Sequence, residues 1–403
     1  MLFRLGYRFL KNVSPRLAWK AGRLWVLPGM KTLRAYKRRL KHGELFPPFL
    51  MLALTDACNL RCRGCWITSI EESRHADAPR QLSPAQVQTV IDSGKKHSCF
   101  YYTLLGGEPL LYPHLWEILE KNRDCYFQVI TNGVFLDADA AARFRKCGNA
   151  TVLLSLDGTS ACNDRRRGEG VYDAVKAAAE CLNREGILFG VATTVTAENI
   201  LDVTADAYVD ELMRWGAMYL WYYIYRPVGA DPAPELAVPA ESIVELRRKI
   251  LDLRRRKPII LIDTYWNAAG EALCPAARGM SFHIGPGGSV EPCPPISFAR
   301  QNVDDNAGDL FKTINESAYL RGFQDFVNRR TQGCVILEHP RELAAFLREQ
   351  NVTDCTGRTD GIDELAVSVP KCSHHQPGKE MPETMWLYRF LKKMLFFGLG
   401  GYG

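Results

Sequence analysis

Residues 55–66 read Thr55-Asp-Ala-Cys58-Asn-Leu-Arg-Cys62-Arg-Gly-Cys65-Trp66, with three thiols at the spacing C-x3-C-x2-C. A strand-like apolar run, residues 49–54, comes directly before this loop. Three thiolates can hold three irons of a [4Fe–4S] cube and leave the fourth iron open to another ligand. A zinc knuckle is the alternative, and it would need a fourth ligand, for which His75 is the nearest candidate. The spacing favours the cluster.

The same alternation of strand and loop recurs along the chain. Strand-like runs lie at residues 49–54, 101–105, 127–131, 152–156, 189–195 and 218–225, and helical patterns with start signals such as Ser83-Pro84 separate them. Six such units predict an α/β fold with a parallel sheet covered by helices. In such barrels the chemistry lies on the loops that follow the strands, which is where the cysteine loop falls.

Polar and glycine-rich loops follow the next three strands. Gly106, Gly107 and Glu108 come after the second strand, Asn132 after the third, and Ser155 and Asp157 after the fourth. Each could be a plain turn by itself. Because the carboxyl ends of parallel strands meet at one edge, we expect these residues to share a pocket.

These motifs, with the following Asn163-Asp164-Arg165-Arg166, resemble the radical S-adenosylmethionine (SAM) superfamily. The resemblance covers about residues 48–228 and implies a partial (β/α)6 TIM-like barrel. It implies that a reduced [4Fe–4S] cluster cleaves SAM to a 5′-deoxyadenosyl radical, which abstracts hydrogen from an unactivated C–H. The family often has an aromatic residue before the third cysteine; here that residue is Gly64, and Trp66 is expected to cover the adenine side.

The resemblance also assigns residues to the cofactors. Cys58, Cys62 and Cys65 would bind the cluster, and the amino and carboxylate groups of SAM would chelate its open iron. The other assigned residues are Gly106, Gly107 and Glu108 at the methionine ammonium, Ser155, Asn132 and Asp157 at the ribose or sulfonium, and Thr194 and Tyr223 near the adenine. No catalytic side chain is singled out.

A second set of cysteines follows the predicted barrel. Cys274 and Cys293 flank a glycine-rich hairpin, similar to the first half of the SPASM/twitch domains that ligate an auxiliary [4Fe–4S] cluster. The resemblance implies Cys274, Cys293 and Cys334 as ligands, with Cys372 preferred over Cys355 as the fourth. We expect the remaining cysteines to be packing residues: Cys99, Cys125, Cys147, Cys162 and Cys181.

The charge of the chain is unevenly distributed. The sequence of 403 residues has a net charge of +6, yet residues 1–43 contain twelve Lys or Arg and no Asp or Glu. Apolar residues recur at helical spacing among these charges, a pattern typical of helices that lie on an anionic membrane surface. The alternative is a helix packed on the barrel with its basic face in solvent. Nucleic acid binding is not expected.

Composition limits the other possibilities. The 47% hydrophobic and 24% charged residues are typical of a globular protein. Thirteen cysteines are too sparse for a secreted disulfide scaffold, and no signal peptide is expected. We therefore expect a cytoplasmic protein, either free or peripheral on the inner membrane face.

The expected domains are a basic arm (1–46), the barrel (47–228), a linker helix and strand (229–270), an auxiliary cluster domain (271–378) and an aromatic, basic C-terminal helix with a glycine-rich tail (379–403), which we expect to pack on the barrel. The favoured function is a radical SAM enzyme acting on a small molecule or on a lipid or isoprenoid-like substrate, reduced by a flavodoxin or ferredoxin. The alternatives are a peptide or small-metabolite maturase of the SPASM/twitch type and a non-catalytic Fe–S electron-transfer protein.

Overall fold

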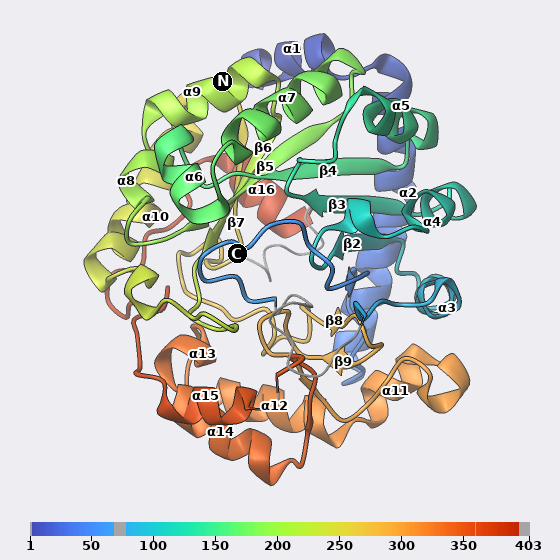
Figure 1. The fold of residues 1–403 in the computed structure, drawn as a ribbon, viewed down its shortest axis with the longest axis vertical. Coiled ribbons are helices and arrows are strands. Elements are labelled where there is room, and N and C mark those ends of the chain that lie inside the picture. Colours follow the sequence, from blue (N-terminus) through green and yellow to red (C-terminus); the bar gives the residue numbers. More distant parts are fainter. Residues whose placement is uncertain (1, 68–77, 359, 395–403) are drawn as a thin grey trace.

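The computed structural model describes residues 2–67, 78–358 and 360–394, and its centre is a parallel sheet curved into a partial barrel (Figure 1). The strands lie in the order β7-β6-β5-β4-β3-β2-β1-β8-β9. Their bounds are β1 (Leu50–Ala53), β2 (Tyr101–Leu105), β3 (Tyr126–Thr131), β4 (Ala150–Ser155), β5 (Phe189–Val195), β6 (Tyr219–Ile224), β7 (Ile260–Asp263), β8 (His283–Ile284) and β9 (Val290–Glu291). The predicted fold class is confirmed.

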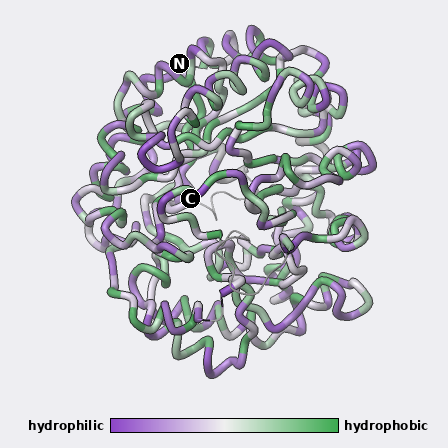
Figure 2. The backbone as a smooth tube through the Cα atoms, in the orientation of Figure 1, coloured by the Kyte–Doolittle hydropathy of each residue, from purple (hydrophilic) through white to green (hydrophobic). Residues whose placement is uncertain are grey.

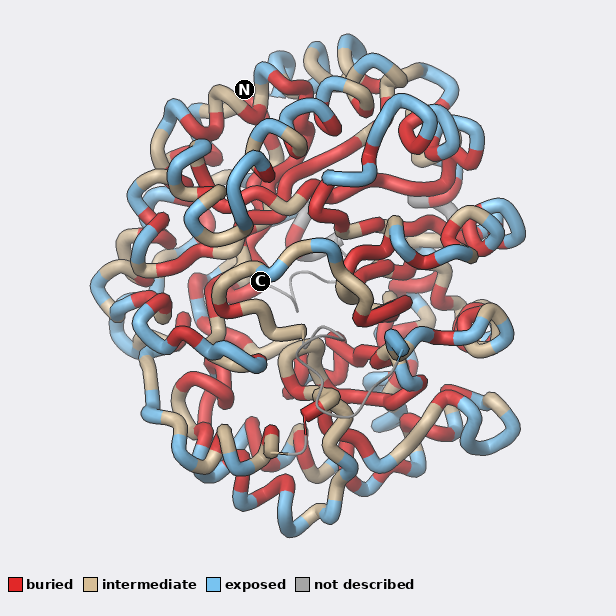
Figure 3. The backbone as a smooth tube through the Cα atoms, in the orientation of Figure 1, coloured by how far each residue is buried: buried red, intermediate tan, exposed pale blue. Residues whose placement is uncertain are grey.

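Helices cover the outside of the sheet. They are α3 (Pro84–Lys96), α4 (Leu115–Lys121), α5 (Ala138–Cys147), α6 (Ser160–Arg167), α7 (Val171–Arg184), α8 (Ile200–Val203), α9 (Asp206–Trp215) and α10 (Ala240–Arg256). The expected start at Ser83 is present as a capping box, in which the Ser83 hydroxyl accepts from Gln86 N at 3.1 Å and Ser83 N donates to the Gln86 side chain at 3.0 Å. The strands are almost wholly buried, whereas the helices alternate between buried and exposed positions (Figure 3). The helices also alternate between hydrophobic and hydrophilic residues (Figure 2).

The main sheet has two parallel strands besides the six expected, β7 and β8. Strand β7, from the segment assigned to a linker, pairs with β6 from Tyr219↔Ile260 to Tyr222↔Asp263. Only four residues long, it ends in Asp263, a buried acid that pairs with Arg247 at 2.7 Å. A short strand with a charged end gives a weak apolar pattern in the sequence, which explains why the helix and strand expected here were assigned to a linker and not to the barrel.

The basic arm packs on the barrel as two helices, α1 (Leu2–Asn12) and α2 (Pro15–Lys41). Its basic side chains donate to carbonyls at the ends of barrel helices: Arg8 to Met213 O at 3.0 Å, Lys20 to Cys147 O, and Arg39 to His97 O. These carbonyls belong to α9, α5 and the C-cap of α3, just before strands β6, β4 and β2. The arm therefore crosses the amino-terminal ends of the strands.

The C-terminal helix α16 (Trp386–Met394) covers the edge strand β7, in agreement with the expected packing on the barrel. The Tyr388 hydroxyl accepts from Leu261 N at 3.0 Å and donates to Ile259 O at 3.2 Å, so it occupies backbone groups of the free edge. Lys392 reaches Asp263 at 2.9 Å. Residues 395–403 of the expected tail lie outside the described residues.

The remaining segment lies against the other edge of the barrel (Figure 1). Its hairpin β8–β9 joins the main sheet, because β8 pairs in parallel with β1. The other elements are β10 (Phe298–Ala299), α11 (Leu310–Glu316), α12 (Ala318–Asn328), α13 (Val335–Glu338), α14 (Pro340–Glu349), β11 (Thr353–Asp354) and α15 (Gly361–Val367). None of the helices in the described part of the chain combines the length and apolar content that a bilayer crossing demands.

Candidate functional site

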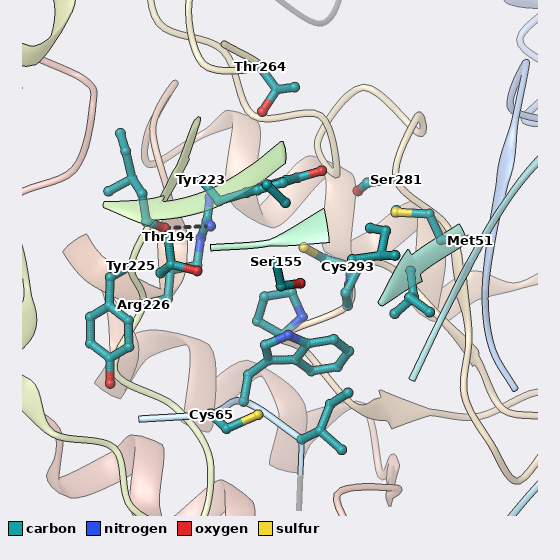
Figure 4. A pocket seen from close by; sticks show the side chains of 18 of the residues that line it. Met51, Cys65, Ser155, Thr194, Tyr223, Tyr225, Arg226, Thr264, Ser281 and Cys293 are labelled. Carbon is teal, nitrogen blue, oxygen red and sulfur yellow. Dashed lines mark hydrogen bonds between the residues drawn. The ribbon is translucent and has the colours of Figure 1, made fainter. Parts of the chain in front are cut away.

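One cavity of about 350 Å³ lies at the carboxyl ends of the strands and brings the two cysteine sets together (Figure 4). Its wall includes Cys58, Cys62 and Cys65 from the loop after β1, and Cys274, Cys293 and Cys334 from the segment after β7. Figure 4 shows Cys65 and Cys293 in the same pocket, together with Ser155. The sequence predicts two cysteine sets; the structure adds that they face one space.

The first cysteine loop is compact. Cys65 N donates to Cys62 O at 3.0 Å, and Gly64 between them has a φ of +67°, which favours glycine. A side chain at Gly64 would collide with the ring of Tyr225, which follows β6. Tyr225 thus takes the space of the aromatic residue that is often found before the third cysteine in the family. Burial raises the pKa of Cys58 to about 12.

The glycine loop after β2 packs directly on the cysteine loop. Gly107 N donates to Thr55 O at 2.7 Å, and Glu108 N donates to Ala57 O at 2.8 Å. A Cβ atom at Gly106 or Gly107 would collide with this backbone. Both glycines line the cavity, as predicted for residues that contact SAM.

The Glu108 carboxylate links two loops. It is fully buried and accepts from Leu110 N at 2.9 Å, Thr131 Oγ1 at 2.7 Å and Asn132 N at 2.7 Å. Burial raises its pKa, and these three hydrogen bonds oppose the shift. Glu108 is not among the residues that line the cavity, so its contact with the methionine ammonium stays a prediction.

Asn132 and Ser155 line the cavity, as expected. Asn132 Nδ2 donates to Asn59 Oδ1 at 2.8 Å and lies 3.9 Å from the Cys58 sulfur. The third strand therefore places an amide directly beside the first cysteine set.

Asp157 pairs with two arginines. Its carboxylate is fully buried and accepts from Arg166 at 2.5 Å, Arg167 at 2.7 Å and Thr194 N at 2.7 Å. Burial alone would raise the pKa of Asp157, but the two arginines outweigh burial and hold it below its usual value. Like Glu108, Asp157 does not line the cavity, so the contact with SAM predicted for it stays a prediction. The structure shows that it positions two arginines that do line the cavity.

Sequence reasoning did not select those arginines as site residues. Arg166 and Arg167 lie on α6, next to the predicted loop after β4, and their charges act on Cys65. The sequence feature that could have indicated them is the run of three arginines, residues 165–167, at the end of α6. They give this side of the cavity a positive charge.

The deeper part of the cavity is the barrel interior. Successive strand residues alternate between this interior and the helices, so that Met51, Gln128 and Trp221 line the cavity while their neighbours are core. Tyr223 and Thr194, the two expected adenine neighbours, also line it, and Trp221 stacks on Tyr223 with ring centroids 5.5 Å apart. The buried Trp221 Nε1 has no hydrogen-bond partner among the described residues.

The second cysteine set surrounds Arg226. Its Nε donates to Cys334 Sγ at 3.1 Å, and its guanidinium lies over the Tyr265 ring at 5.4 Å. Burial raises the pKa of Cys274 to about 11 and also raises that of Cys293. Arg226 is a residue that the sequence did not reveal.

The structure does not bring the predicted fourth ligand to these three thiols. Cys372 is exposed and Cys355 lies near Ser289 and Glu291, and neither lines the cavity. The chain does return to the cavity near Cys372, because His374 lines it, but the Cys372 side chain is exposed.

The donor atoms suit iron–sulfur clusters. Each set offers three thiols, the ligands of such clusters. Across the described residues, no three side chains of His, Cys, Asp or Glu are placed to hold a single metal ion. His75, the fourth ligand of the zinc alternative, lies outside the described residues.

Comparison with known proteins agrees with this geometry. The radical SAM superfamily matches residues 52–207. Mycofactocin maturase MftC of Mycolicibacterium smegmatis is 30% identical over 273 residues, 64% of this chain and 66% of the relative. MftC of Mycobacterium ulcerans is 31% identical over 271 residues, 64% of this chain and 70% of the relative.

The match thus spans about two thirds of these relatives' own length. Among solved structures, SuiB of Streptococcus suis bound to S-adenosylmethionine aligns with a TM-score of 0.60 at 17% identity, over 75% of this chain and 73% of SuiB, a likeness of fold. This chain belongs to the radical SAM superfamily and is an enzyme of the kind that uses a [4Fe–4S] cluster and SAM.

Proposed function

We propose that this chain is a maturase that abstracts hydrogen from a carbon atom of a peptide. The observation that carries the proposal is the single cavity lined by both cysteine sets and open to the barrel interior. The name of the MftC relatives supports a maturase. SuiB has been solved bound to the precursor peptide SuiA, and we carry a peptide substrate over to this chain as part of the proposal.

Within this proposal Cys58, Cys62 and Cys65 hold the first cluster, and SAM lies across Gly106, Gly107, Asn132 and Ser155. Bound there, the cofactors supply a 5′-deoxyadenosyl radical after one electron arrives from a flavodoxin or ferredoxin. Arg166 and Arg167 offer positive charge that pairs with the carboxylate of SAM. A substrate in the cavity would give up one hydrogen atom from carbon to this chemistry, with 5′-deoxyadenosine as the product.

Cys274, Cys293 and Cys334, which line the same cavity, would hold an auxiliary cluster. When bound there, such a cluster would supply a one-electron acceptor, so a peptide oxidised in the cavity would lose two hydrogens in all. Arg226 donates a hydrogen bond to the thiol of Cys334 and stabilises negative charge there.

A peptide replaces the lipid-like molecule as the favoured substrate. The basic arm, whose composition suggested a lipid, crosses the amino-terminal ends of the strands, whereas the cysteine loops lie at their carboxyl ends. A lipid held by the arm would therefore be separated from the cysteines by the length of the barrel. A small-metabolite substrate would undergo the same chemistry, and turnover with separate peptide and small-metabolite fractions distinguishes the two.

The test is turnover by the anaerobically reconstituted chain with SAM and dithionite, in the presence of peptide, small-metabolite or lipid fractions. We expect 5′-deoxyadenosine and methionine, and a mass loss of two hydrogens in a peptide. The Cys58→Ala/Cys62→Ala/Cys65→Ala variant is the control and should release neither product. Absence of 5′-deoxyadenosine with every fraction would contradict radical chemistry, and a mass change confined to the other two fractions would contradict the peptide.

The outer side of the basic arm supports a separate proposal, that it contacts an anionic lipid surface. Phe3 is 87% exposed and Leu10 is 77% exposed, and Tyr7 and Trp19 are exposed with them. Nine basic residues of the arm are also exposed: Arg4, Lys11, Arg16, Arg23, Lys31, Arg34, Lys37, Arg38 and Lys41. A second copy docked on this face would meet like charge, whereas anionic lipids offer opposite charge and apolar depth.

Co-sedimentation of the full chain with vesicles of equal parts phosphatidylglycerol and phosphatidylcholine tests this contact. The Phe3→Ser/Tyr7→Ser/Leu10→Ser variant should lose most binding, while Leu201→Ser/Val367→Ser, which changes exposed apolar residues elsewhere, should not. Equal binding to vesicles of phosphatidylcholine alone would refute an anionic partner.

The domain limits remain part of the proposal, with one change. The expected roles stay unchanged for residues 1–46, 47–228, 271–378 and 379–403. Residues 229–270 are assigned to the barrel instead of a linker, because they supply α10 and β7.

A further inference from the structure

Residues 373–375 lie between two loops of the second cysteine set. His374 is buried and lines the same cavity as Cys274, Cys293 and Cys334. Its ring nitrogen Nε2 lies 3.1 Å from the carbonyl oxygen of Leu273, the residue before Cys274.

The same segment packs against the loop of Cys334. A Cβ atom at Gly333, the residue before Cys334, would collide with Ser373 and His375. Ser373 donates a hydrogen bond to Glu338 on α13, and the Trp266 indole donates to the His374 carbonyl at 3.2 Å. Contacts on both sides therefore hold residues 373–375 next to Leu273 and Gly333, the residues that directly precede Cys274 and Cys334.

The hydrogen bond to Leu273 determines which ring nitrogen is free. A backbone carbonyl only accepts, so Nε2 carries the hydrogen and Nδ1 of the neutral ring holds a lone pair. A histidine that binds metal through one nitrogen usually donates its other N–H to a carbonyl or carboxylate. His374 therefore has the second-shell contact that is typical of a metal ligand.

We propose that His374 is the fourth ligand of the auxiliary cluster, through Nδ1, beside the thiolates of Cys274, Cys293 and Cys334. This inference rests on the auxiliary cluster of the proposed function. It replaces Cys372, which is exposed, and Cys355, which lies near Ser289 and Glu291. Imidazole replaces thiolate on iron in Rieske [2Fe–2S] centres, where it raises the reduction potential.

The experiment uses the full chain with Cys58→Ala/Cys62→Ala/Cys65→Ala, which leaves only the auxiliary site. The wild type should bind about eight irons and this variant about four, as expected for two cubes and one. With isotopically labelled histidine, pulsed EPR of the reduced cluster should show one strongly coupled histidine nitrogen. Adding His374→Cys should keep four irons and abolish that coupling.

Three matched variants in the same background serve as controls: His375→Ala, Cys372→Ala and Cys355→Ala. Each should keep both the iron and the nitrogen coupling. Coupling that persists in His374→Cys, or iron lost from either cysteine control, would overturn the assignment.

A background variant without iron would overturn the assignment together with the auxiliary cluster. A cluster with four irons and no histidine coupling would overturn the assignment alone. Peptide turnover by the wild type is measured separately, so failure of the proposed substrate is distinguishable from either result.

Discussion

The buried carboxylate of Asp157 offers the sharpest test of how the barrel supports its cofactor. Asp157→Asn keeps the shape of the side chain and an oxygen for Thr194 N, but it removes the negative charge from Arg166 and Arg167. The side chains of these arginines are only 13% and 10% exposed. Breaking a buried pair leaves an uncompensated charge and costs about 3–5 kcal/mol. Because a little solvent reaches both arginines, we expect about 3 kcal/mol.

Two measurements test the role of Asp157, one of stability and one of SAM affinity. Chemical unfolding should show the loss of stability, and SAM affinity of the reconstituted enzyme should fall about tenfold, equivalent to ~1.4 kcal/mol, because the arginines leave their place on the cavity wall. Asp325→Asn, at an exposed position on α12, is the control and should change stability by less than about 0.5 kcal/mol.

The pH dependence gives an independent check. The pKa of Asp157 is lowered in the folded chain, so its contribution to stability is present above the unfolded value near 4 and is lost as the pH falls through the folded value. The stability difference between wild type and Asp157→Asn should therefore be constant above about pH 5 and shrink at lower pH. A variant as stable as the wild type at pH 7, or a difference that grows in acid, would refute the role given to this ion pair.

Two other predictions concern the loops around the clusters. Gly107→Ala places a Cβ against the backbone of Ala57, so we expect a loss of about 1–3 kcal/mol and of iron at the first site, whereas Gly287→Ala, with open space around it, should leave iron content unchanged. Arg226→Gln removes a charged donor from Cys334 and should lower the reduction potential of the auxiliary cluster in an EPR-monitored titration while iron content stays constant; an unchanged potential would contradict that contact.

The sequence predicted what short segments determine. The cysteine loop and the glycine loop lie within a few residues of a strand end, so their spacing alone located them at the edge where the cavity is found. It could not predict Arg226 or His374 as part of the site. Arg226 contacts Cys334, 108 residues away, and His374 contacts Leu273, 101 residues away, only once the chain has folded. The pairing of Asp157 with Arg166 and Arg167 could not be predicted either, because a motif gives the residue but not the direction of its side chain.

The excess positive charge of the arm has a structural origin that composition could not reveal. Barrel helices end at the amino-terminal side of the sheet, where their last carbonyls and the negative ends of their dipoles gather. Arg8, Lys20 and Arg39 satisfy such carbonyls. An acidic side chain at these positions would be repelled by the carbonyl oxygens. This explains why the side of the arm that faces the barrel has no acidic residues, but it does not explain their absence from the exposed side. The absence of acidic residues from the exposed side needs a separate explanation, which the proposed contact with an anionic lipid surface would provide.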